Sequence, residues 1–144
     1  MAHILSYGSL NLDLVYQVPH FVQAGETLSS TSRTVHCGGK GLNQSIAAAR
    51  AGGTVSHAGK IGGDGTVLTD ILRESGVDTD FVTVGDGPSG HAVIQVDPSG
   101  RTVSCSSAAA IRRSPMRRST GRWRTSRPET ISFCKMRSTA WTIS

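Results

Sequence analysis

The sequence predicts an α/β protein over residues 1–103, followed by a segment of a different kind. Short apolar runs alternate there with longer segments of helical spacing, a pattern typical of a parallel or mixed sheet covered by helices. The apolar content of 37% and the aromatic content of 5% suit such a protein. Residues 1–103 hold six Lys or Arg against nine Asp or Glu, whereas residues 104–144 hold nine against one.

The first elements of this part are predicted from residue types and their spacing. Residues 3–7 form a short apolar run before a glycine, which predicts a buried strand. Alternation over residues 12–18 and a composition rich in Ser, Thr and Val over residues 26–37 predict two more strands. A glycine-rich turn then leads into a helix that includes residues 46–51, since alanine is the best helix former and two glycines follow.

A second helix is predicted farther along the chain. Asp64 is a suitable N-cap for it, and apolar residues at every third or fourth position form one face. Gly76 and Val77 fit the Schellman motif at its end. The remaining strands are predicted at residues 54–58, 81–84 and 91–96, and a turn is predicted at residues 97–100.

Residues 104–144 show no sustained helical or strand period. Arg, Ser and Thr dominate, and both tryptophans lie here. On these grounds the segment is a basic tail without regular structure. Binding of nucleic acid by the tail is an alternative that we do not favour, although Lys, Arg and aromatic side chains suit phosphates and bases.

Several classes of protein are disfavoured by the composition. Three cysteines and five histidines have no metal-ligand spacing, so we expect neither a disulfide framework nor a metal site. No run reaches the 18 or so apolar residues that a membrane-spanning helix needs. The first residues lack the features of a signal peptide, which favours the cytoplasm.

The candidate ligand site centres on residues 38–44, GGKGLNQ. Glycines let the backbone approach a ligand closely, and the following helix offers unpaired N–H groups. Lys40 adds donors, and Asn43 both donates and accepts hydrogen bonds, which suits a polyol. This is not a Walker A loop, because Gly41 stands where Ser or Thr is needed. Taken alone, the stretch is equally compatible with a ligand site and with a tight turn that binds no ligand.

Two further motifs flank this one, at residues 8–13 (GSLNLD) and 59–64 (GKIGGD). In sequence and order the three resemble the N-terminal signature of the ribokinase (PfkB-type) carbohydrate kinases, over about residues 4–102. The lysine within the central motif favours the ribokinase branch. The resemblance implies a three-layer αβα sandwich with a small β-lid, cut here to its N-terminal portion, with lid strands at about 12–18 and 26–37.

The resemblance also implies roles for single residues. Asn11 and Asp13 match residues that hydrogen-bond the sugar hydroxyls, for which the alternative is an ordinary polar turn. The loop that closes over the same sugar is matched by Gly38, Gly39, Lys40 and Asn43. The residues of the third motif, Gly62, Gly63 and Asp64, are interpreted as mainly structural. In ribokinases the lid covers the sugar and pairs with a second lid in a homodimer.

The activity implied is phosphorylation of a sugar, D-ribose first of all, at its terminal hydroxyl, with ATP, Mg²⁺ and a monovalent cation. In the family the catalytic Asp belongs to a later Gly-Ala-Gly-Asp motif, which these 144 residues lack. We therefore assign no catalytic residue and expect the chain to be inactive. The alternatives are a non-catalytic sugar-binding remnant, or another sugar or nucleoside kinase of the family.

A frameshift is a further hypothesis for residues from about 104 onward. When each codon is re-read as its last base plus the first two of the next, residues 107–112 can spell Gly-Gly-Gly-Asn-Gln. Residues 134–144 can spell Gln-Asn-Glu-Ile-Asn-Gly-Met-Asp-Tyr. Both resemble ribokinase segments expected just after the strand at 91–96. The coding DNA would test this.

Overall fold

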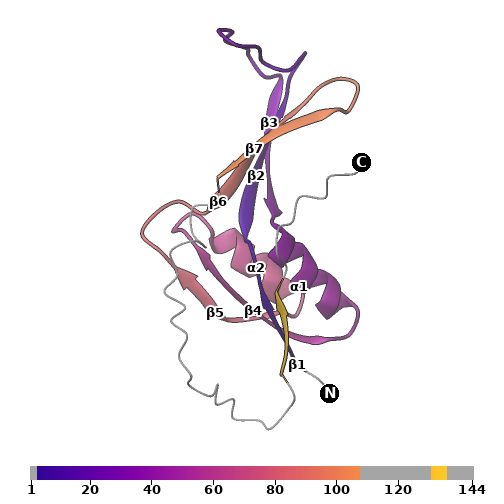
Figure 1. Ribbon diagram of the computed structural model, residues 1–144, viewed down its shortest axis with the longest axis vertical. Coiled ribbons are helices and arrows are strands. Elements are labelled where there is room, and N and C mark those ends of the chain that lie inside the picture. The colour runs from indigo at the N-terminus through magenta and orange to yellow at the C-terminus, as the bar shows by residue number, and fades with distance from the viewer. Residues whose placement is uncertain (1–2, 108–130, 136–144) are drawn as a thin grey trace.

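The computed structural model describes residues 3–107 and the backbone of residues 131–135 (Figure 1). These residues form two four-stranded sheets and two helices. In chain order the elements are β1 (His3–Tyr7), β2 (Asn11–Gln17), β3 (Ser32–Gly38), α1 (Lys40–Arg50), β4 (Thr54–Ile61), α2 (Thr66–Glu74), β5 (Asp78–Val84), β6 (Gly90–Val96), β7 (Thr102–Ser107) and β8 (Ile131–Lys135). Neither described helix is long and apolar enough to cross a bilayer.

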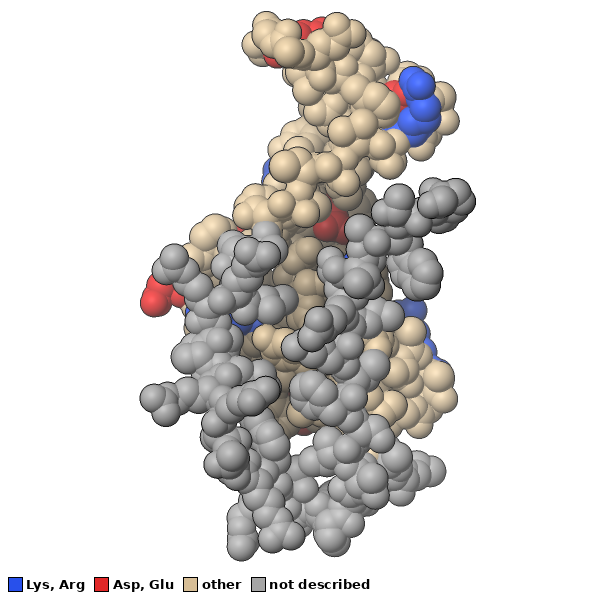
Figure 2. All heavy atoms as spheres, viewed as in Figure 1, with Lys and Arg blue, Asp and Glu red and all other residues tan. Residues whose placement is uncertain are grey.

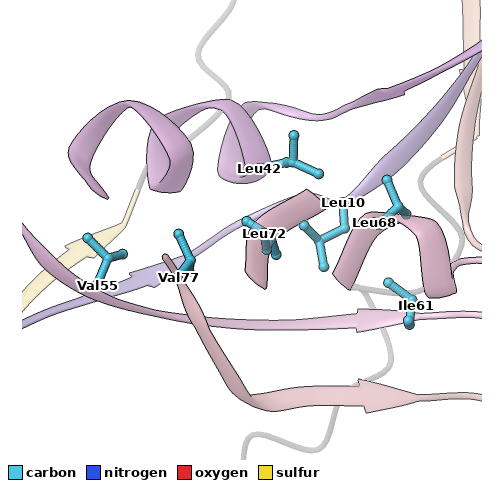
Figure 3. Packing of buried hydrophobic residues seen from close by; sticks show 7 residues of the cluster. All are labelled: Leu10, Leu42, Val55, Ile61, Leu68, Leu72 and Val77. Carbon is cyan, nitrogen blue, oxygen red and sulfur yellow. The ribbon is translucent and has the colours of Figure 1, made fainter. Parts of the chain in front are cut away.

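The main sheet has the strand order β5-β4-β1-β8, and all its pairs are parallel. Helices α1 and α2 pack against each other and against this sheet, and the core lies between them (Figure 3). Leu42 of α1 and Leu68 and Leu72 of α2 are buried there. They pack with Val55 of β4 and with Val77, which directly precedes β5. The α/β prediction is therefore confirmed. Within the described residues both helices cover the same face, so these residues form two of the three layers.

The second sheet, which we call the lid, has the order β3-β2-β6-β7 and projects as a narrow arm from the main body (Figures 1 and 2). The predicted strand at 12–18 is confirmed as β2, and the predicted strand at 26–37 is confirmed only from Ser32 onward as β3. Strand β6 runs parallel to β2 and belongs to the lid, a partnership that its apolar composition did not reveal.

Both helices end as predicted, and one predicted cap is wrong. At the end of α2 the N–H of Val77 donates to the carbonyl of Leu72 at 3.0 Å, and that of Gly76, with φ +79°, donates to Arg73 at 2.9 Å. This is the predicted Schellman motif. Asp64 is not the N-cap, because α2 begins at Thr66 after Gly65; its carboxylate instead accepts the N–H of Ser89 at 2.8 Å.

The expectation of a tail without regular structure from residue 104 is wrong for two stretches. The predicted boundary falls inside β7, which pairs antiparallel with β6 from Val96↔Thr102 to His91↔Ser107. Residues 131–135 form β8, parallel to β1. Pairing with an existing strand, which local composition does not record, accounts for both. The rest of that prediction lies outside the described residues.

Candidate functional site

The loop after β1 packs directly against the turn that begins α1. The carbonyl of Ser9 accepts the N–H of Leu42 at 3.1 Å, and the Ser9 hydroxyl accepts the N–H of Lys40, also at 3.1 Å. Gly39 at the N-cap has φ +103°, a conformation that favours glycine. A Cβ on Gly41 would collide with the backbone of Gly8. The first and second glycine motifs of the sequence therefore meet as a single backbone junction.

Asn11 and Asp13 begin β2 beside this junction. In the lid Asn11 is in register with Gly38 of β3 on one side and with Gly90 of β6 on the other. A Cβ on Gly90 would meet the side-chain oxygen of Asn11, and a Cβ on Gly38 would meet the carboxylate of Asp13. The two glycines thus leave room for the two polar side chains on either side of β2. The structure brings Asn11, Asp13 and Gly38 close together.

The electrostatic surroundings of Asp13 differ from those of an ordinary surface carboxylate. The group is half-buried, and burial raises its pKa above the ordinary value. The charge of His36 on β3 offsets only part of this rise. A partly desolvated carboxylate still accepts hydrogen bonds strongly, which is what a polyol hydroxyl requires. This arrangement can hold a neutral, hydroxyl-rich ligand.

Lys40 and Asn43 lie in the first turn of α1. The backbone of Lys40 bonds to Ser9, and that of Asn43 donates to the carbonyl of Gly39 at 3.1 Å. Both residues are exposed. Their backbones are thus fixed at the junction, and their side chains face solvent beside it. No described contact joins either side chain to Asp13.

A buried hydrogen bond fixes the helix that carries the glycine turn. Ser45 of α1 and His57 of β4 are both fully buried, and the Ser45 hydroxyl lies 2.7 Å from Nδ1 of His57. Burial lowers the pKa of His57 to about 4, so its imidazole is neutral at pH 7. No histidine was expected to have a role, because Ser45 and His57 come together only when α1 packs on β4.

Residues of the third glycine motif form hydrogen bonds with Ser89, just before β6. The N–H of Gly62 donates to the hydroxyl of Ser89 at 2.9 Å, and Ser89 in turn donates its N–H to Asp64. Hydrogen bonds from the side chain and the N–H of Ser89 lower the pKa of Asp64. Since Ser89 precedes Gly90, this contact fixes the start of β6 next to Asn11. The role of Ser89 was missed, because a single serine before a strand carries no signal.

A cavity of about 260 Å³ lies elsewhere, on the lid. Its lining residues are Tyr16, Val18, Val22, Leu28, Ser30, Val93 and Gln95. None of the predicted site residues is among them. Because side chains alternate along a strand, Tyr16 lies on the lid face opposite to that of Asp13.

Comparison with known proteins shows the family to which the chain belongs. Residues 1–116 match the model of the pfkB family of carbohydrate kinases, past the change of composition near residue 104. The ribokinase of Haemophilus influenzae is 41% identical over 92 residues, which is 62% of this chain and 30% of that protein. The ribokinase of Bacillus subtilis is 40% identical over 99 residues, 65% of this chain and 34% of that protein.

Solved structures of ribokinases also match this chain. The Cryptococcus neoformans ribokinase in complex with ADP matches 74% of this chain and 34% of its own, with a TM-score of 0.69 and 41% identity. The Arabidopsis thaliana ribokinase complexed with ribose and ATP has a TM-score of 0.65 and 29% identity over 74% of this chain and 36% of its own. The chain thus spans about a third of the length of the relatives it matches. It belongs to the pfkB family of carbohydrate kinases.

Proposed function

We propose that this chain is the sugar-binding part of a ribokinase-type kinase, and that it binds D-ribose or a related sugar at the junction of β2 and the glycine turn. The observation that carries this is the placement of Asn11 and Asp13 at the start of β2, with Gly38 and Gly90 leaving room for their side chains. Lys40 and Asn43 would contribute from the first turn of α1.

The acceptor and donor types present fit a polyol. Asp13 would accept hydrogen bonds from two hydroxyls, and Asn11 would both donate and accept. Gly38 and Gly39 would let the backbone approach the ring closely. Relatives named as ribokinases, one of them solved with ribose and ATP, support ribose as the first sugar to test.

The residues present do not fit a nucleotide site. ATP and Mg²⁺ with a monovalent cation would be the cofactors of a whole kinase, but these 144 residues contain no Gly-Ala-Gly-Asp motif. Within the described part of the chain no cluster of His, Cys, Asp or Glu could hold a metal ion. We assign no phosphoryl-transfer step to this chain and propose that it is inactive alone, a non-catalytic sugar-binding unit.

The compartment and the tail are parts of the same proposal. We place the chain in the cytoplasm, where ATP and free sugar are available to such a kinase.

We also propose that residues from about 104 onward result from a frameshift in a ribokinase gene. Sequencing the coding DNA tests this idea, and early stops in the alternative frame would eliminate it.

Isothermal titration calorimetry with D-ribose tests the binding proposal. Wild type binds, and Asp13→Asn weakens the affinity by about tenfold or more, because hydrogen bonds to a charged acceptor contribute roughly 1.5–3 kcal/mol. The control Asp86→Asn alters an exposed loop carboxylate and leaves the affinity unchanged. Equal affinity in wild type and Asp13→Asn would refute the site.

A coupled ATPase assay with ribose tests the proposed inactivity. The signal is expected to stay at background, and a ribose-dependent signal would refute inactivity.

A further inference from the structure

A histidine stands directly beside Asp13 on the lid. Residues Asp13 of β2 and His36 of β3 are paired in register, and paired residues on adjacent strands point to the same face of a sheet. His36 is exposed, and its Nε2 lies 3.1 Å from the hydroxyl of Thr34, two residues earlier on the same face. The imidazole is thus held on the face that carries Asp13.

Few charged groups surround this histidine. On β2 the group that faces it is Asp13, and the nearby end of α1 contributes Lys40. Strand β6 contributes none on this face, since the residue in register with Asp13 there is Ala92. Arg33 and Cys37 belong to the opposite face of β3 because side chains alternate along a strand. Among the described residues, Asp13 is therefore the principal electrostatic partner of His36, and the charge of His36 lowers the pKa of Asp13.

We propose that His36 is a further sugar-contacting residue that makes binding tighter when its imidazole is protonated. Thr34 engages Nε2, which leaves Nδ1 for a hydroxyl of the ligand. This inference deepens the proposed function and rests on it. Histidine is the side chain type whose charge ordinarily changes between pH 5 and 8.

The direction of the effect follows from desolvation. A sugar seated over Asp13 removes water from an ionised carboxylate, which is unfavourable. A positive charge on His36 offsets this cost, so sugar binding is coupled to proton uptake. Affinity therefore rises from pH 8 to pH 6, by about two- to fivefold for a charge pair near the surface. At lower pH it falls again as Asp13 itself becomes protonated.

Calorimetry of the whole chain with D-ribose at pH 8, 7 and 6 tests the inference, in buffers of different ionisation enthalpy that report proton uptake. Wild type shows the rise in affinity and proton uptake. His36→Gln keeps a hydrogen-bonding side chain but loses both effects. His20→Gln, which removes an exposed histidine bonded to Glu26 in the 18–31 loop, behaves as wild type. A flat wild-type profile, or a pH dependence that survives His36→Gln, overturns the inference.

A titration without sugar separates this inference from the proposed function. In the ligand-free chain, NMR of the Asp13 carboxyl carbon shows a higher titration midpoint in His36→Gln than in wild type, because a neighbouring cation has been removed. An unchanged midpoint refutes the coupling, whether or not ribose binds. Absence of ribose binding at every pH with a shifted midpoint refutes the proposed sugar, while the electrostatic pairing stands.

Discussion

At the scale of single residues, two glycines determine where the polar side chains of the site can lie. Gly38 and Gly90 flank β2 in register with Asn11, and each has the oxygen of a site residue where a Cβ would stand. The sequence predicted Asn11, Asp13 and Gly38 as site residues. It could not single out Gly90, because that glycine belongs to a strand whose partner is not recorded in local sequence.

Gly38→Ala tests this role. The added Cβ forces the Asp13 carboxylate to move, so we expect unfolding free energy to fall by about 1–3 kcal/mol, the usual cost of overpacking. Ribose affinity falls as well, because Asp13 no longer lies in its native position. Denaturant unfolding and calorimetry measure the two effects. Gly63→Ala is the matched control, since nothing lies within 4 Å of a Cβ there; equal stability of the two variants would contradict the account.

His57 makes a second residue-scale prediction, on pH. Its folded pKa of about 4 lies below the usual 6.5, so the unfolded chain binds the proton more tightly. The stability linked to His57 is present above pH 6.5 and is lost as pH falls towards 4, on the order of 3 kcal/mol in total.

Urea unfolding between pH 7 and 4 measures this loss, and a second variant isolates it. His57→Asn keeps a polar partner for Ser45 but cannot titrate in this range, so its stability falls less steeply with acid than that of wild type. Wild type and His57→Asn with parallel pH profiles would show that the imidazole is not held neutral by burial.

At the scale of elements, the lid carries an apolar row on the face away from Asp13. In register across the sheet are Val35 of β3, Leu14 of β2 and Val93 of β6, and Val35 and Val93 are 48% and 38% exposed. Val103 of β7 is 51% exposed. We propose that a second copy of this chain covers the row, as the lid-to-lid homodimer of ribokinases implies.

Sedimentation equilibrium tests the lid dimer. Val93→Asp places a charge in the centre of the row, so the chain dissociates to monomers at concentrations where wild type is dimeric. Val84→Asp, at a 67% exposed position at the end of β5, leaves the association unchanged. A wild-type chain that remains monomeric throughout would eliminate this proposal.

Elements with a strong local signal were predictable, and those that depend on a partner were not. The end of α2 followed from Gly76 and Val77, because a Schellman motif is specified by the residues that form it. The N-cap at Asp64 was wrong because Ser89, 25 residues away, takes its carboxylate. Strands β7 and β8 were missed, since each alternates apolar and polar residues over only a few positions and each is defined by pairing with β6 or β1.

At the scale of the whole molecule, the lid and the main sheet meet where the site residues lie. The chain passes from β1 of the main sheet into β2 of the lid, and returns from β3 of the lid to α1. Asn11 and Asp13 lie at the first of these crossings, where β2 begins, and the glycine turn lies at the second, before α1. Under the proposed function, a sugar held there would lie where the lid meets the main sheet.

The most direct test of the proposed sugar site is a D-ribose titration of the isotope-labelled chain followed by amide NMR. We expect the amide signals of Asn11, Asp13 and residues 38–40 to shift together and to saturate with one dissociation constant. The signals of residues around the lid cavity, such as Tyr16 and Gln95, are expected to stay unchanged. Shifts confined to that cavity, or no shifts at a ribose concentration in the tens of millimolar, would contradict it.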